Sequence, residues 1–169
     1  KLMKGNSSCV HMQQIKEVII RKAIKSDYES VIKIMSQVQD MHVKWRPDIY
    51  KPNENLIPED MFEKIIENGT FYVAEANDIV VGVLEIVFRH VESPSHVSRD
   101  VIFIDTMAID ENYRGMGIGH QMFDFLKAMK QEMGLDGIEL QVNAKNRAAY
   151  EMYQKCGFTE KSINMELLD

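Results

Sequence analysis

The chain has 169 residues, a formal net charge of −6, and 45% hydrophobic against 27% charged residues. This length predicts one domain with a sizeable core, and the apolar runs are far shorter than the roughly 20 residues of a membrane span. The negative charge, without a Lys/Arg-rich arm, argues against sequence-independent nucleic-acid binding. Two cysteines, Cys9 and Cys156, make no disulfide framework, so we expect a cytoplasmic protein with reduced thiols.

The first residues stand apart from the rest of the chain. Residues 1–11 fit neither a helix nor a strand pattern, and His11-Met12 is a dipeptide that a common cloning site leaves behind. We interpret 1–11 as a cloning remnant or a disordered N-terminus, and we expect a single domain over residues 12–169.

A strand and two helices are predicted next. Residues 17–24 are typical of a first strand. Ser26 and Glu29 form a capping box, so we expect a helix that begins there and ends before Pro47. A second, short helix begins near Pro58, which suits a first helical turn.

The second half of the chain alternates strands and helices. Residues 70–76 and 79–88 predict two strands joined by a tight hairpin at Asn77-Asp78, and the polar residues 91–100 predict a loop. The remaining predicted elements are a strand at 101–109, a helix ending at Gly134, a strand at 137–142, a helix at 146–155, and one or two strands from Phe158 onward. This order predicts a mixed α/β fold, with about six to seven strands and helices on both faces of the sheet.

The stretch ENYRGMGIGH (111–120) places Gly115, Gly117 and Gly119 on alternate positions between a strand and a helix. A Rossmann fingerprint would need its third glycine at His120 or Met122, and a Walker loop would need Gly-Lys-Ser/Thr, so a nucleotide-binding module is disfavoured. The remaining design is a helix N-terminus whose unpaired N–H groups bind an anion such as a pyrophosphate. A glycine-rich cap without a ligand is the alternative.

A second stretch, residues 143–158, predicts a helix with a small residue beside a hydroxyl. Asn146, Ala149 and Tyr153 share one face at helical spacing. Ala149 would let a ligand approach, and Tyr153 would offer its hydroxyl to it. An amphipathic helix with a half-buried tyrosine is the alternative for this stretch taken alone.

Together the two stretches resemble the GNAT superfamily of acyl-CoA-dependent N-acyltransferases. Residues 114–119, RGMGIG, match its Arg/Gln-x-x-Gly-x-Gly/Ala signature, and Asn146…Tyr153…Gly157-Phe158 matches its second signature. The resemblance covers about residues 70–160. It implies a mostly antiparallel central sheet that splays between the strands at 101–109 and 137–142, with acetyl-CoA as the donor lying in the gap.

The resemblance also implies a set of donor-binding residues. The pantetheine arm would pair with the first of these strands, and Tyr153 would protonate the leaving thiolate. The residues implied in donor binding are Met107, Ala108, Ile109, Arg114, Gly115, Met116, Gly117, Ile118, Gly119, His120, Asn146 and Tyr153.

The general base is left open between two carboxylates. Asp105 and Glu85 each interrupt an apolar strand, and a buried carboxylate is costly unless it is paired or functional. A position on a surface-facing strand edge is the alternative for Asp105. Trp45, Arg46 and Tyr50, between the first two helices, are candidates for the acceptor wall, with local packing as the alternative.

The acceptor itself is only broadly indicated. Residues 26–69 hold nine acidic against five basic side chains, which favours a cationic amine on a small molecule or a protein. The histidines show no ligand spacing, so we expect no metal, and we expect no nucleic-acid or membrane partner. A homodimer is among the expected assemblies. The rival function is a non-catalytic acyl-CoA sensor or pseudo-enzyme, which would keep the glycine turn but need no Tyr153.

Overall fold

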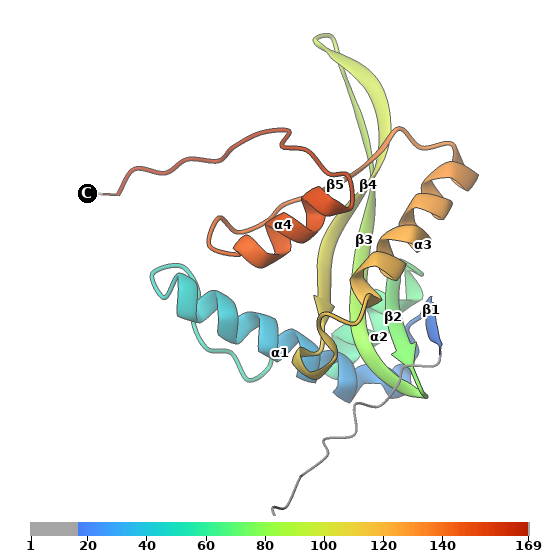
Figure 1. Cartoon of the computed structure of the whole chain (residues 1–169), viewed down its shortest axis with the longest axis vertical. Helices are drawn as coiled ribbons and strands as arrows, with labels where there is room; N and C mark the ends of the chain where they lie inside the picture. The colour runs from blue at the N-terminus through green and yellow to red at the C-terminus, as the bar shows by residue number, and fades with distance from the viewer. Residues whose placement is uncertain (1–16, 169) are drawn as a thin grey trace, which may run out of the picture.

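The computed structural model describes residues 17–168 as a five-stranded sheet with helices on both faces (Figure 1). The early residues 1–11 lie outside this range. In chain order the elements are β1 (Val18–Lys22), η1 (Lys25–Asp27), α1 (Tyr28–Trp45), α2 (Glu59–Glu67), β2 (Phe71–Ala76), β3 (Ile79–Ser93), β4 (His96–Ile109), η2 (Glu111–Tyr113), α3 (Ile118–Met133), β5 (Gly137–Leu140) and α4 (Arg147–Lys155).

The sheet has the strand order β1-β2-β3-β4-β5. The first three pairs are antiparallel, and β4 pairs with β5 in parallel. The mixed, mostly antiparallel sheet with helices on both faces is therefore confirmed. The strand number is lower than the expected six to seven, because residues 158–168 are extended but pair with no strand of the described chain.

The predicted loop at 91–100 is wrong. β3 and β4 continue through it as a hairpin, with Val91 opposite Arg99 and Ser93 opposite His96, and the hairpin projects beyond the helices (Figure 1). Only Pro94 and Ser95 form the turn. Both faces of this outer part of the hairpin contact solvent, so its strands need no alternation of apolar and polar residues. Its polar sequence is therefore typical of a loop as well. The other hairpin, at Asn77-Asp78, is confirmed, and both residues have positive φ, as a type I′ turn requires.

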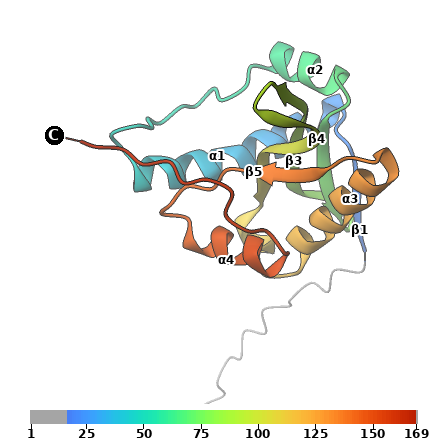
Figure 2. The same cartoon turned by 90° about the horizontal axis from the view of Figure 1, so that it is seen from above.

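Two apolar cores lie on opposite faces of the sheet, and Figure 2 shows the helices that cover them. On one face α3 contributes Ile118, Met122, Phe123 and Leu126, with residues of α4 packed against them. On the other face Val31 and Ile34 of α1 and Phe62 of α2 pack on the strands. This arrangement gives the site two walls, one from α1 and α2 and one from α3 and α4.

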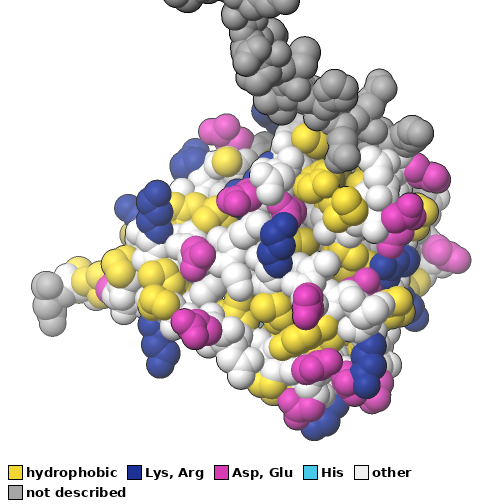
Figure 3. All heavy atoms as spheres, turned by 90° about the horizontal axis from the view of Figure 1, so that it is seen from below, with side chains coloured by type: hydrophobic (Ala, Val, Ile, Leu, Met, Phe, Trp, Pro, Cys, Tyr) yellow, Lys and Arg dark blue, Asp and Glu magenta, His cyan; other side chains and the backbone are white. Residues whose placement is uncertain are grey.

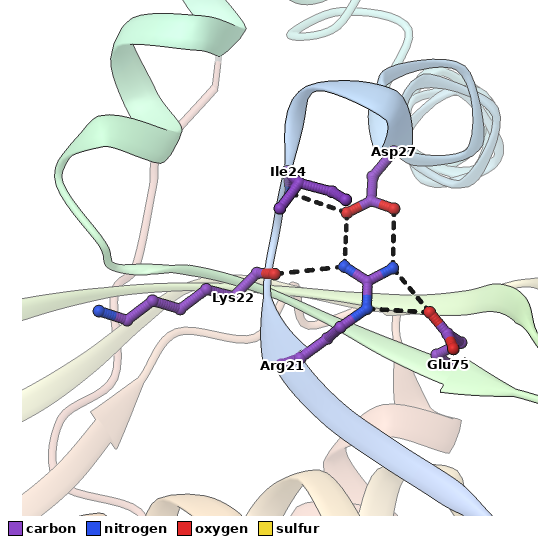
Figure 4. Close-up of polar contacts among 5 residues, drawn as sticks. All are labelled: Arg21, Lys22, Ile24, Asp27 and Glu75. Atoms are coloured by element: carbon purple, nitrogen blue, oxygen red, sulfur yellow. Dashed lines mark hydrogen bonds and ion pairs between the residues drawn. The ribbon is translucent and has the colours of Figure 1, made fainter.

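A partly buried ion-pair network fixes the start of α1 to the sheet (Figure 4). Both terminal nitrogens of Arg21 donate to the Asp27 carboxylate, at 2.8 and 2.9 Å, and Arg21 also donates to Glu75 on β2. Asp27 in addition accepts from the backbone N–H of Ile24. The capping box expected from Ser26 and Glu29 is therefore wrong: Asp27 precedes the helix, because its carboxylate can satisfy the backbone and Arg21 together.

Candidate active site

The glycine turn joins η2 to α3 at the carboxyl end of β4. Gly115 and Gly117 have φ of +75° and +83°, and no atom lies within 4 Å of where a Cβ would stand on either. Their backbone conformation, not crowding, requires glycine. α3 begins at Ile118 without a side-chain cap, and its first internal bond runs from Gln121 N–H to the Gly117 carbonyl. The N–H groups of residues 118–120 are therefore open to an anion.

Gly119 serves a different purpose from the two glycines before it. A Cβ there would lie 3.1 Å from Met152 Sδ and 3.4 Å from Ile109 Cδ1. The third glycine lets α3 pack closely against α4 and β4. It holds the walls of the site together, whereas the sequence interpretation assigned all three glycines to the approach of an anion.

Arg114 lies on the α1 side of the turn. Its Nε donates to the Ile109 carbonyl at 3.1 Å, and Nη1 lies 3.9 Å from Met41 Sδ. It lines a hollow of about 250 Å³ with Gln37, Asp40, Met41, Lys44 and Glu111. Figure 3 views the molecule from this end and shows acidic and basic side chains interspersed across it.

The middle of α1 is fastened to the end of β4 by contacts that the sequence did not indicate. Lys33 pairs with the buried Asp110 at 2.9 Å, and Gln37 accepts from the Glu111 N–H at 2.9 Å. Burial alone would raise the pKa of Asp110, but the bonds from Lys33 and the Asn112 N–H hold it below its usual value. α1 therefore holds a fixed place beside the glycine turn.

The sheet opens between β4 and β5. β5 pairs with Val101–Ile104, so within residues 17–168 the second half of β4 has a strand neighbour on the β3 side alone. Asp110 N–H donates to the Val81 carbonyl, and alternation then directs the backbone groups of Met107 and Ile109 to the open side. The expected splay is present, and Met107 and Ile109 lie at its edge. Ala108 instead turns its backbone to β3 and buries its side chain against α1 and α2.

The two candidate bases lie side by side at a β-bulge. Ile86 pairs with Ile104 and Glu85 with Thr106, so Asp105 is the extra residue. Asp105 is exposed, whereas Glu85 is half-buried. Burial and then the charge of Asp105 raise the pKa of Glu85, although a hydrogen bond with Thr106 opposes the shift. The raised pKa separates Glu85 from Asp105, and Thr106 is a contact that sequence reasoning missed.

Glu85 faces the α1/α2 side of the sheet. Val83 belongs to the core beneath those helices, and Leu84 belongs to the opposite core. Because side chains alternate along a strand, Glu85 has the same direction as Val83. Its side chain therefore lies on the face of the sheet that α1 and α2 cover.

Tyr153 belongs to the opposite wall, where it packs against the core beneath α3. Its ring packs edge-on against Phe123 of α3 at 5.7 Å and lies 5.9 Å from Phe158. Burial, and to a smaller extent Cys156, raises the pKa of its phenol, which keeps the group protonated at neutral pH. Asn146 does not share the helix face with Tyr153 as expected. It precedes α4 and caps it, accepting from the Ala149 N–H at 3.2 Å.

An aromatic cluster lies at the far end of α1. Trp45 and Tyr50 come together through His42, whose ring stacks on Tyr50 at 4.8 Å and tilts toward Trp45 at 5.9 Å. Burial lowers the pKa of His42, which favours its neutral form. Sequence reasoning missed His42, although its place three residues before Trp45 on the helix could have revealed it. Arg46 pairs with Asp48 and Glu166, so its charge is already compensated.

Two further properties of residues 17–168 bear on the class of site. None of their helices combines the length and apolarity that crossing a membrane requires. No three His, Cys, Asp or Glu side chains among these residues gather closely enough to hold a metal ion.

Comparison with known proteins identifies the architecture. A solved structure of a mutant of the BH1408 protein from Bacillus halodurans superposes with a TM-score of 0.83 at 28% identity, covering 89% of this chain and 98% of that one. An aminoglycoside N-acetyltransferase, AAC(6')-Iy in complex with CoA, shares the fold at 16% identity, with a TM-score of 0.66 over 90% of this chain and 95% of that one.

Curated sequences agree with the structural comparison. The chain is 28% identical over 160 residues to an N-alpha-acetyltransferase of Sulfurisphaera tokodaii, covering 88% of this chain and 84% of that protein. It spans about half the length of two other curated relatives, 52% of one and 42% of the other. The family model for the acetyltransferase (GNAT) family matches residues 36–158, most of the chain and both walls of the gap. With the glycine turn, the splayed sheet and this match together, the chain belongs to the acetyltransferase (GNAT) family.

Proposed function

We propose that the protein is an N-acetyltransferase that transfers an acetyl group from acetyl-CoA to a primary amine of a cationic acceptor. The observation that carries the proposal is the alignment of three features along one gap. Open N–H groups stand at the start of α3, an unpaired edge of β4 leads away from them, and Glu85 lies beside the bulge in that strand. The family membership supports acyl transfer as the reaction.

Acetyl-CoA would bind through its pyrophosphate and through the amide groups of its pantetheine arm. Its pyrophosphate suits the N–H groups of residues 118–120, at the positive end of the α3 dipole. Its pantetheine arm has the amide groups to pair with Met107 and Ile109, as an added strand does. The Ile109 carbonyl already accepts a hydrogen bond from Arg114. Either Arg114 would release this carbonyl to the pantetheine arm, or it would keep the bond and the arm would pair with the Ile109 N–H alone.

The transfer needs two proton steps on opposite walls of the gap. Glu85 takes a proton from the ammonium or the attacking amine, directly or through water, so that nitrogen can form a bond to the thioester carbon. A backbone N–H of β4 polarises the carbonyl oxygen. The C–S bond then breaks, and Tyr153 donates its proton to the sulfur. The proton held by Glu85 then returns through water to the Tyr153 phenolate, and an acceptor that starts as an ammonium releases one further proton to solvent. The amide and the free thiol leave, and both side chains are restored.

Charge and aromatic surface support a cationic acceptor. The acidic excess in residues 26–69 attracts a cation, and Trp45 and Tyr50 can face one at van der Waals distance. The similar proteins include a streptothricin acetyltransferase and an N-alpha-acetyltransferase, so small-molecule amines and α-amines both belong in a first screen. The cytoplasmic location expected from the sequence stays a prediction.

The first experiment measures donor binding. A ligand that binds only the folded state raises the melting temperature, so acetyl-CoA should do so while ATP and NAD should not. Gly117→Asp should abolish the rise because it puts a negative charge against the pyrophosphate. Gly117→Asn is the matched control, since it has the same shape and the same tolerance of a positive φ but no charge, and it should retain part of the rise.

The second experiment identifies the acceptor. A panel of polyamines, aminoglycosides, other antibiotic amines, lysine derivatives and peptide N-termini is incubated with acetyl-CoA, and released thiol is followed. Turnover with a member of the panel supports the enzyme. Stabilisation by ATP or NAD in place of acetyl-CoA would refute the proposed donor, and donor binding without turnover on any amine would favour the acyl-CoA sensor.

A further inference from the structure

The second half of β4 has less support than the rest of the sheet. Within residues 17–168 it pairs with β3 on one side, and its other side is the open edge on which the proposed function places the pantetheine arm. A segment with few neighbours opens locally at a low cost in free energy. Contacts from outside the sheet must therefore hold the end of β4 where the donor is to bind.

Two side chains of α1, which lies beside the end of β4 in Figure 1, supply such contacts. The Lys33 ammonium lies 2.9 Å from the carboxylate of Asp110, the residue directly after β4. Gln37 accepts a hydrogen bond from the Glu111 N–H at 2.9 Å. Lys33 and Gln37 are four residues apart, so they lie on the same face of the helix. Together they hold a side chain and a backbone group at the end of the strand.

A third residue on this face of α1 reaches the glycine turn. Met41 follows Gln37 by four residues, and its Sδ lies 3.9 Å from Nη1 of Arg114. Arg114 also donates through Nε to the carbonyl of Ile109, the last residue of β4. The open edge of β4 and the first residue of the turn are therefore held against a single helix face.

These contacts matter more for β4 than for α1, whose position is fixed without them. The apolar face of α1 is buried in the core beneath it, and the Arg21–Asp27 pair fixes the start of the helix to the sheet. Asp110, by contrast, is only 3% exposed, and Lys33 is its one ion-pair partner among residues 17–168. Loss of the Lys33 contact would therefore release the end of β4 and leave α1 in place.

We propose that Lys33 and Gln37 are positioning residues for the donor, which align the open edge of β4 with the N–H groups at the start of α3. The pantetheine arm and the pyrophosphate belong to one molecule, so acetyl-CoA binds tightly only where the strand edge and the helix start are held in the right geometry. Both residues act through the end of β4, without contact to the donor. This role rests on the proposed function, and it gives α1, on the acceptor side of the sheet, a part in donor affinity.

The test measures the dissociation constant of acetyl-CoA by calorimetry in two variants that break the ion pair with opposite changes of charge. Lys33→Met removes a positive charge. Asp110→Asn removes a negative one and keeps a side-chain oxygen that can accept from the Asn112 N–H. Misalignment should raise the dissociation constant about tenfold in both variants, the loss expected when one hydrogen bond to an anion is missing. Charge attraction alone would weaken binding in Lys33→Met and tighten it in Asp110→Asn.

Three more variants separate positioning from stability. Gln37→Met removes the acceptor for the Glu111 N–H without a change of charge and should also raise the dissociation constant. Lys33→Arg keeps a cation for Asp110 and should restore most of the affinity. Arg21→Met releases the other end of α1, so it should lower the resistance to urea yet leave the dissociation constant within about twofold of the wild type.

The outcomes distinguish the positioning role from the proposed function. Unchanged affinity in both Lys33→Met and Asp110→Asn overturns the positioning role. Opposite changes in these two variants, or an equal loss of affinity in Arg21→Met, also overturn it, because they assign the effect to charge or to general stability. A wild type that does not bind acetyl-CoA refutes the proposed donor itself, and the positioning role with it.

Discussion

The pair formed by Arg21 and Asp27 should stabilise the fold through the charge of a buried carboxylate. Arg21→Met removes the two guanidinium bonds to Asp27, at 2.8 and 2.9 Å, and leaves Asp27 with the Ile24 N–H as its partner. Breaking a fully buried pair costs about 3–5 kcal/mol. The Arg21 side chain is 30% exposed, so water moderates the loss. We expect about 2–3 kcal/mol at neutral pH after this discount for solvent screening.

The pH dependence separates charge from packing. In the wild type, burial would raise the pKa of Asp27, but the bonds from Arg21 and Ile24 outweigh it and hold that pKa below its usual value. The stabilisation is present above the unfolded pKa of about 3.9 and is lost as the pH falls through the folded pKa. Without Arg21, burial should raise the pKa instead, so the variant loses stability as the pH rises.

Urea unfolding of both proteins from pH 7 to pH 3 measures the difference. The gap in free energy of unfolding should be largest at neutral pH and shrink toward acid, with a slope of at most about 1.4 kcal/mol per pH unit for one proton. Glu75→Gln, which keeps the Arg21–Asp27 pair, should cost less than half as much. A gap that does not change between pH 7 and pH 3 would refute the reasoning and assign the loss to packing.

Three further predictions concern the gap and its walls. The acid limb of the kcat/KM profile should lie above the usual glutamate pKa of about 4.3, and Glu85→Gln should remove it. Asp105→Asn should keep the limb but move it to lower pH, because the charge of Asp105 raises the pKa of Glu85. A limb that moves in neither variant would exclude Glu85. Tyr153→Phe should lower single-turnover transfer about 10²-fold at saturating acetyl-CoA with donor binding unchanged, and a loss within about twofold would leave it a packing residue. Gly119→Val should cost about 1–3 kcal/mol in urea unfolding, because its side chain meets Met152 and Ile109; a cost near zero would contradict the close packing.

Pairing between distant strands explains the main errors in the predicted fold. Residues 91–100 are polar and contain Pro94, which is typical of a loop, yet they extend the β3–β4 hairpin because each strand pairs with the other in solvent. The reverse happened at residues 159–168, where the alternating pattern predicts a strand. A pattern specifies a strand's faces, but a partner edge must exist before the strand forms.

Local sequence was enough for the features that depend on a residue and its near neighbours. These are the positive-φ turn at Asn77-Asp78, the glycine turn before α3 with its open N–H groups, and the order of helices and strands. The two short motifs that led to the family are local in the same sense. Tertiary contacts were needed to distinguish the two candidate bases, Glu85 and Asp105. Both interrupt apolar strands in the sequence, and only their burial in the fold differs. They also made Asn146 a helix cap and brought His42 to Tyr50. Burial and contact depend on segments far away in the chain, and a local pattern carries no record of which segments those are.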